Sequence, residues 1–137
     1  RLSDHPLRHQ IWEAIGCKST AEVKARVVQP DFGAAGFAGL APLLVAAAQD
    51  GLPEAAAIVR HSAEALSASV TTVARTLGLP TPKLVGHGGA LDHLQHFHEA
   101  VRQAIAQHLP DARWCSASGD ACHGALVLAQ QMAIRPR

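Results

Sequence analysis

The sequence predicts a helix-rich α/β fold with few strands and flanking helices. Hydrophobic residues make up 48% and charged residues 17% of the 137 residues, which favours a folded chain over a disordered one. The hydrophobic excess is mainly alanine, and aromatic residues are only 4%, a composition typical of helices. In the second half, apolar runs bounded by proline and glycine alternate with amphipathic segments, which indicates strands connected by helices.

The amino-terminal part, residues 1–78, is expected to form helices that begin at caps and end at glycine or proline. Ser3 or Asp4 can cap a first helix, which ends at Gly16. In the run STAE, Ser19 is the predicted N-cap of a second helix and Glu22 follows three residues later, which is the spacing of a capping box.

Two longer helices are expected next. The first runs from about Phe37 to Asp50, where Gly51 supplies a left-handed stop, and the second runs from Pro53 to Leu77. Their short connection predicts a helical hairpin. On the second helix, the side facing the core is expected to carry Ile58, Ala65, Leu66, Val70, Val73 and Leu77.

Residues 79–137 are expected to alternate between strands and helices. Because the prolines of LPTPKLVGHGG forbid a helix, Lys83 to Gly86 is predicted as a buried strand, and ARWCSA as a second one. A helix beginning at Asp92 lies between them, and a final helix covers GDACHGALVLAQQMA. The inward residues of the middle helix are Leu94, Phe97, Val101, Ile105 and Leu109. A right-handed crossover makes the strands parallel, and residues 1–137 are interpreted as one domain.

Charge and cysteine content narrow the classes of partner. The formal net charge is +1, and Lys and Arg are spread along the chain, which disfavours nucleic acid and a membrane surface as partners. The sequence has no apolar run near 18 residues, and its three cysteines form no CxxC pair, so a reducing cytoplasm is expected. Since the chain opens with RLSDHPLRH and no methionine, we expect it to be a piece of a longer protein.

The stretch LVGHGGALDH places three glycines, Gly86, Gly88 and Gly89, directly after a predicted strand. Ligands of open α/β sheets bind outside the carboxyl ends of the strands, where a glycine backbone lets a flat ligand or a phosphate approach closely. The alternative is a turn that only needs positive φ angles. The stretch matches neither GxGxxG nor a P-loop.

Read in order, the apolar strand, Gly-Gly, amphipathic helix, short strand and GDACHGALVLA resemble the end of the actin-like sugar kinase and ATPase superfamily. The resemblance is greatest to the BadF/BadG-type ATPase family, which includes N-acetylglucosamine and glucosamine kinases. The helical stretch FAGLAPLLVAAAQDGLPEAAAIVRHSAEAL is similar to helices that precede the Gly-Gly strand in those kinases. The resemblance covers roughly Phe32 to Ala129.

The resemblance implies an actin-like, ribonuclease H-like lobe that supplies the adenosine side of a cleft for ATP. It assigns adenosine binding to Gly88 and Gly89, with Ala90 beside them. The implied reaction is phosphoryl transfer from ATP, with Mg²⁺, to an amino sugar. Because the sequence has no DGGGT-like or second phosphate loop, we expect no catalytic residue or metal ligand here. The base, the Mg²⁺ site and most sugar contacts are expected in a missing amino-terminal lobe.

The run DHLQHFH offers a competing site. Asp92, His93 and His96 are spaced so that one helix face could present them to zinc, with a remote fourth ligand. No HExxH or CxxC pattern supports this arrangement, and solvated histidines are the preferred interpretation.

The run WCSASGDACHG permits a thiol site made of Cys115, Cys122 and His123. Buried structural cysteines are the preferred interpretation. Ser118 or Asp120 can instead cap the final helix. Gly124 and Ala125 would then let that helix lie close to the nucleotide-binding loop.

Two other functions remain open at this stage. A non-catalytic helical interaction module would bind no nucleotide. An activator ATPase of the same superfamily would normally carry an iron–sulfur cluster, which the cysteine spacing does not support. The identity of the sugar and the presence of a homodimer are not determined by the sequence.

Overall fold

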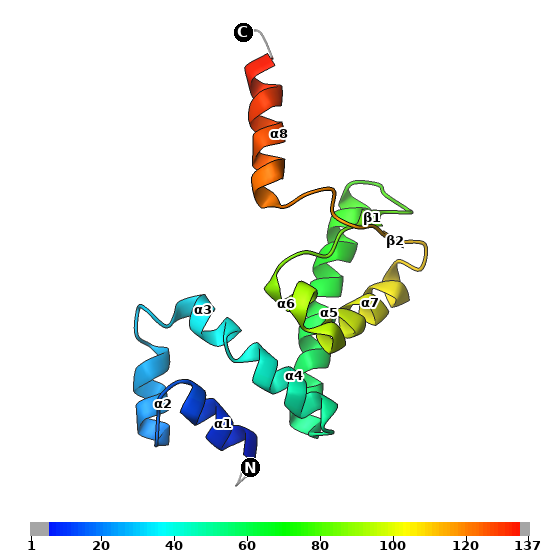
Figure 1. Cartoon of the computed structure of the whole chain (residues 1–137). Coiled ribbons are helices and arrows are strands. Elements are labelled where there is room, and N and C mark those ends of the chain that lie inside the picture. The colour runs from blue at the N-terminus through cyan, green and yellow to red at the C-terminus, as the bar shows by residue number, and fades with distance from the viewer. Residues whose placement is uncertain (1–5, 135–137) are drawn as a thin grey trace.

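A computed structural model describes residues 6–134 of the chain (Figure 1). These residues are helix-rich, with 69% in helices and two parallel strands, which confirms the coarse fold class. The elements in chain order are α1 (Pro6–Ala14), α2 (Thr20–Val27), α3 (Gly33–Ala38), α4 (Ala41–Gln49), α5 (Pro53–Thr76), β1 (Lys83–Leu84), α6 (Gly89–His93), α7 (Gln95–His108), β2 (Arg113–Trp114) and α8 (Ala121–Ile134).

The capping box predicted for the second helix is confirmed at the start of α2. The Ser19 hydroxyl accepts the Glu22 N–H at 3.2 Å, while Glu22 Oε2 accepts the Lys18 N–H at 2.8 Å. Hydrogen bonds from the Lys18 N–H and the Ser19 hydroxyl hold the pKa of the Glu22 carboxyl below its ordinary value. The caps expected for α1, Ser3 and Asp4, lie outside the described residues.

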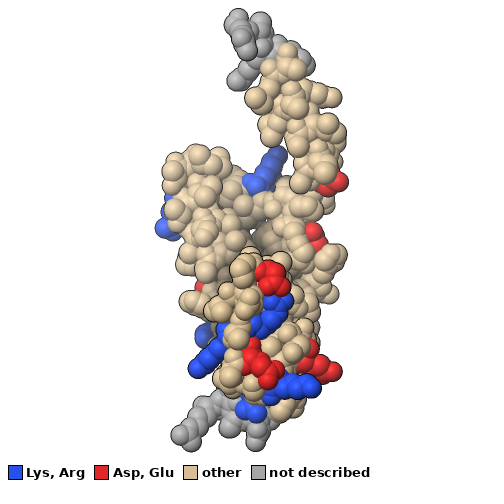
Figure 2. All heavy atoms as spheres, turned by 90° about the vertical axis from the view of Figure 1, so that its left-hand side faces the viewer, with Lys and Arg blue, Asp and Glu red and all other residues tan. Residues whose placement is uncertain are grey.

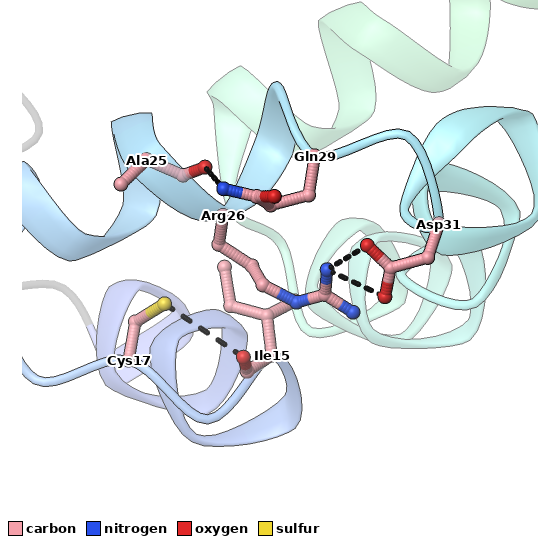
Figure 3. Close-up of polar contacts among 6 residues, drawn as sticks. All are labelled: Ile15, Cys17, Ala25, Arg26, Gln29 and Asp31. Carbon is pink, nitrogen blue, oxygen red and sulfur yellow. Dashed lines mark hydrogen bonds and ion pairs between the residues drawn. The ribbon is translucent and has the colours of Figure 1, made fainter.

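The turn that follows α2 is held by Arg26 (Figure 3). Arg26 Nη1 donates to both carboxylate oxygens of Asp31, at 3.0 and 3.1 Å, and this contact holds the pKa of Asp31 below its ordinary value. The guanidinium also lies 5.1 Å from the ring centroid of the buried Phe32. The same view shows Cys17 Sγ donating to the Ile15 carbonyl at 3.7 Å.

The helix expected from Phe37 to Asp50 is instead two helices, α3 and α4. Pro42 lies in the first turn of α4, where its missing N–H costs nothing, and it could not continue a helix from α3. The contact between α4 and α5 confirms the expected pairing, with Gly51 at φ +88° between them. The first core cluster forms where α1, α4 and α5 meet: Leu7, Val45, Ala47, Ala48, Ala55 and Val59.

A stripe of mainly small residues forms the buried side of α5, which packs against α4 and α7. The stripe recurs every three or four positions: Ala55, Val59, Ala63, Ser67, Thr71 and Ala74. The face predicted for α5 was therefore mostly wrong, because Ile58, Val73 and Leu77 are 50%, 57% and 64% exposed. Of the predicted residues, Val70 does pack against the core. Small side chains let two helix backbones approach closely, so in this contact size decides which face is buried.

The second core cluster joins α5 and α7 to the sheet. Val101 and Ile105 of α7 and Leu109, its C-cap, are buried as predicted. Leu84 of β1 and Trp114 of β2 pack against this cluster. The strands pair in parallel as predicted, with these two residues opposite one another, but each strand is only two residues long.

Helix α8 projects away from the rest of the chain (Figure 1). It contains no Lys, Arg, Asp or Glu, and its side chains are exposed over residues 121–133. Figure 2 shows charges of both signs mixed over the lower part of the molecule and a projecting helix almost free of them. Within residues 6–134, no single helix has the length and hydropathy to cross a membrane, and only the bent pair Gly33–Gln49 with Pro53–Thr76 meets both criteria together.

The α5–α7 contact generates the first prediction. Ala63 is 1% exposed within the stripe. Ala63→Leu should lower the free energy of unfolding by about 1–3 kcal/mol, because the larger side chain forces the two helices apart. Ala65→Leu, at an exposed position of the same helix, is the control and should change it by less than about 0.5 kcal/mol. Urea unfolding measures both, and equal effects would contradict the assigned face.

Candidate functional site

The candidate site is the glycine turn, residues 86–89, between β1 and α6. Because β1 and β2 are parallel, their carboxyl ends lie at the same edge of the sheet. The turn leaves this edge two residues after the last residue of β1. Ligands of open α/β sheets bind at such an edge.

Glycine is found at the three positions of the turn for different structural reasons. A Cβ on Gly86 would lie 3.2 Å from Cζ3 of Trp114, so this glycine makes room for the indole ring. Gly88 has φ +110°, a conformation that residues with a side chain rarely adopt. Gly89 has no positive φ, and a Cβ there would meet no atom within 4 Å. Thus neither packing within the described chain nor backbone angle explains the glycine at position 89.

The Asp92 side chain folds back over the turn. Its Oδ2 accepts the Gly88 N–H at 2.9 Å and lies 3.3 Å from Nδ1 of His87. Asp92 belongs to α6, and its side chain reaches back to the backbone N–H of the residue that precedes this helix. The contact therefore fixes the turn to the start of α6. A negative charge therefore lies at the amide that an anion would otherwise use.

A layer of aromatic and charged groups supports the turn from α7. The rings of His98 and Trp114 lie 5.5 Å apart, and the Arg102 guanidinium lies 5.1 Å from the Trp114 ring centroid. His98 Nε2 is buried without a hydrogen-bond partner in the described structure, and it lies 3.7 Å from where a Cβ of Gly86 would be. Trp114 and His98 thus lie beside Gly86 in the turn, and Arg102 contacts Trp114.

The predicted site residues Gly88, Gly89 and Ala90 are adjacent and exposed at the start of α6. Their backbone is accessible from solvent, and no side chain of the turn covers it at Gly89. A groove of about 350 Å³ lies next to β1, but its lining includes none of the three. Its lining is apolar except for Ser69 and Lys83: Ser69, Val70, Val73, Ala74, Leu79, Pro82, Lys83 and Leu84.

The alternative zinc arrangement of Asp92, His93 and His96 is not formed in the described residues. The helix expected to run on from Asp92 breaks at Leu94, whose φ of −106° and ψ of 79° are not helical, so α6 and α7 are separate helices. Asp92 and His96 therefore do not share a helix face, and His96 lines a groove between α5 and α7. Among residues 6–134, no three His, Cys, Asp or Glu side chains come together as metal ligands.

The predictions for the carboxyl-terminal cysteines and helix were partly wrong. Cys115 and Cys122 are exposed and free, whereas only Cys17 is buried, because nothing in the described chain covers α8 or the outer side of β2. Asp120 is the cap, since its Oδ1 accepts the His123 N–H at 2.8 Å. Gly124 does not bring α8 against the glycine turn, because a Cβ there would meet no atom within 4 Å.

Sequence reasoning missed the two residues that hold the turn, Asp92 and Trp114. Asp92 lies four positions after Gly88, a spacing from which a carboxylate can reach back to a loop amide. The contact of Trp114 with Gly86 joins positions 28 residues apart and left no local signal.

Comparisons of the chain with protein-family models, with curated proteins and with solved structures found no match. The geometry of the turn and the order of the sequence motifs therefore carry the functional argument.

A series of glycine variants tests the three reasons given above. Gly88→Ala should lower the free energy of unfolding by about 1–3 kcal/mol, because alanine is strained at φ +110°. Gly86→Ala should also destabilise, since Trp114 must move. Gly89→Ala should stay within about 0.5 kcal/mol of the parent. Chemical unfolding measures the loss of stability in each of the three variants. A Gly89→Ala protein as unstable as the Gly88→Ala protein would contradict the reasons given for these glycines.

Proposed function

We propose that this chain is the adenosine-binding, carboxyl-terminal lobe of an ATP-dependent amino-sugar kinase of the BadF/BadG type. Gly88, Gly89 and Ala90 receive the adenosine in this proposal. The observation that carries it is Gly89, a glycine that faces open space at the carboxyl edge of two parallel strands. A backbone without a Cβ allows a flat ligand to lie directly against the main chain.

The arrangement of the second half also supports the proposal. Strand β1, helix α7 and parallel strand β2 form a crossover unit with the glycine turn at its ligand-binding edge. This order is the one in which the sequence resembles an actin-like lobe. A cytoplasmic location, where ATP is available and all three cysteines remain free thiols, fits this role.

A further lobe of the same protein is part of the proposal. It supplies the phosphate loops, the ligands of Mg²⁺, the catalytic base and the sugar contacts. Helix α8 supports this idea, because a mainly apolar helix without Lys, Arg, Asp or Glu is normally covered. When bound, ATP supplies the phosphoryl group, whereas the residues of this chain hold and orient the nucleoside end.

A second candidate, a helical interaction module without nucleotide, is favoured by one observation. Leu126, Leu128 and Met132 of α8 are exposed by 61–76% and would suit a protein partner. The two candidates differ in whether the glycine turn binds adenosine, which the following variants measure.

In the two-lobed protein, Gly89→Val should raise the dissociation constant for ATP tenfold or more, equivalent to about 1.4 kcal/mol, because the side chain occupies the space of the ligand. Sugar binding should change much less. Ala57→Val places the same side chain at an exposed position of α5 and is the control. Calorimetric titration, with thermal unfolding to confirm folding, measures these effects. An unchanged ATP affinity in a folded Gly89→Val protein would contradict adenosine binding at the turn and would show that the glycines serve only the turn conformation.

The 137-residue chain alone should show no sugar-dependent hydrolysis of ATP, because its sequence has no phosphate loop to position the γ-phosphate. A coupled assay for ADP with N-acetylglucosamine and glucosamine checks this expectation. The two-lobed protein serves as the positive control. Turnover by the isolated chain above the background without sugar would refute the assignment of catalysis to another lobe.

A further inference from the structure

The Asp92 carboxylate lies beside the glycine turn, where it contacts the backbone of Gly88, the residue before Gly89. Oδ2 is used within the chain, by the Gly88 N–H at 2.9 Å and by His87 Nδ1 at 3.3 Å. Oδ1 has no hydrogen-bond partner in the part of the chain that the structure describes. The side chain is 38% exposed, so a donor from outside the protein can reach the carboxylate.

The chemistry of this oxygen limits the ligand. An ionised carboxylate only accepts hydrogen bonds, so its partner must present O–H or N–H groups. Its charge also repels a phosphate, and Oδ2 already occupies the Gly88 amide that would otherwise attract one. Acidic residues near the carboxyl ends of parallel strands bind sugar hydroxyls of nucleotides in other α/β folds. An uncharged, hydroxyl-bearing group therefore fits this place, and a phosphate does not.

We propose that Asp92 is a specificity-determining residue that accepts a hydrogen bond from a ribose hydroxyl and keeps phosphate away from the glycine turn. This inference rests on the proposed function, because it concerns the same adenosine site. In it, Oδ2 and His87 hold the carboxylate against the turn, and Oδ1 receives the ligand. The nucleoside then lies with its ribose toward Asp92 and its phosphates directed away from α6.

The test compares adenosine with 2′,3′-dideoxyadenosine in the intact protein. In the parent, the analogue without the hydroxyls should bind about tenfold more weakly or worse, since a hydrogen bond to a charged acceptor is lost. Asp92→Asn keeps an oxygen for the Gly88 N–H but removes the charge and places an NH₂ group at the free position. In this variant the ratio of the two dissociation constants should fall, because only a weaker neutral hydrogen bond from the NH₂ group to the hydroxyl oxygen can remain. Inorganic pyrophosphate should bind more tightly than to the parent.

Asp111→Asn is the matched control. It removes the same charge from an exposed aspartate just before β2, at the opposite edge of the sheet, and should leave the ratio unchanged. A parent ratio near one would overturn the inference without any variant, even if ATP binds, and would leave the proposed function standing. A folded Asp92→Asn protein with the same ratio as the parent would also overturn the inference and leave the proposed function standing. A parent protein that binds neither adenosine nor ATP would overturn both proposals.

Discussion

The close approach of α5 and α7 is the contact from which the rest of the structure is built. Two strands of two residues each cannot be stable alone, and here Leu84 and Trp114 rest on the cluster that these helices form. The strands in turn set where the glycine turn begins. Small residues such as Ala63 and Ala74 make the helix contact close, so the position of the candidate site depends on residues that never touch it.

The elements of the fold were largely predictable because their ends carry local signals. The cap at Ser19, the stop at Gly51 and the apolar period of α7 all act within a few residues. The buried face of α5 was not predictable in the same way. Hydrophobicity ranks Leu and Ile above Ala and Ser, but the nearness of a partner helix reverses that order, and nothing in a single sequence reports how near the partner will be.

The position of the glycine turn after β1 was predicted from the sequence, whereas the side-chain contacts that hold the turn were not. The run of glycines after an apolar segment marks the turn. The sequence does not show that Gly86 makes room for Trp114, that Gly88 has a positive φ angle, and that neither reason applies to Gly89. The break at Leu94 is also invisible, because the apolar pattern continues through it. That break is what separates Asp92 from α7, and on α6 its carboxylate reaches back to Gly88.

Helix α5 belongs to both core clusters, with Ala55 and Val59 in the first and Ala63 and Ala74 in the second. Its 24 residues make a rod of about 36 Å that has no proline after its first position. Because this one helix contributes side chains to both clusters, the two cores share a single continuous element. A substitution that moves α5 in one core therefore also acts on the other.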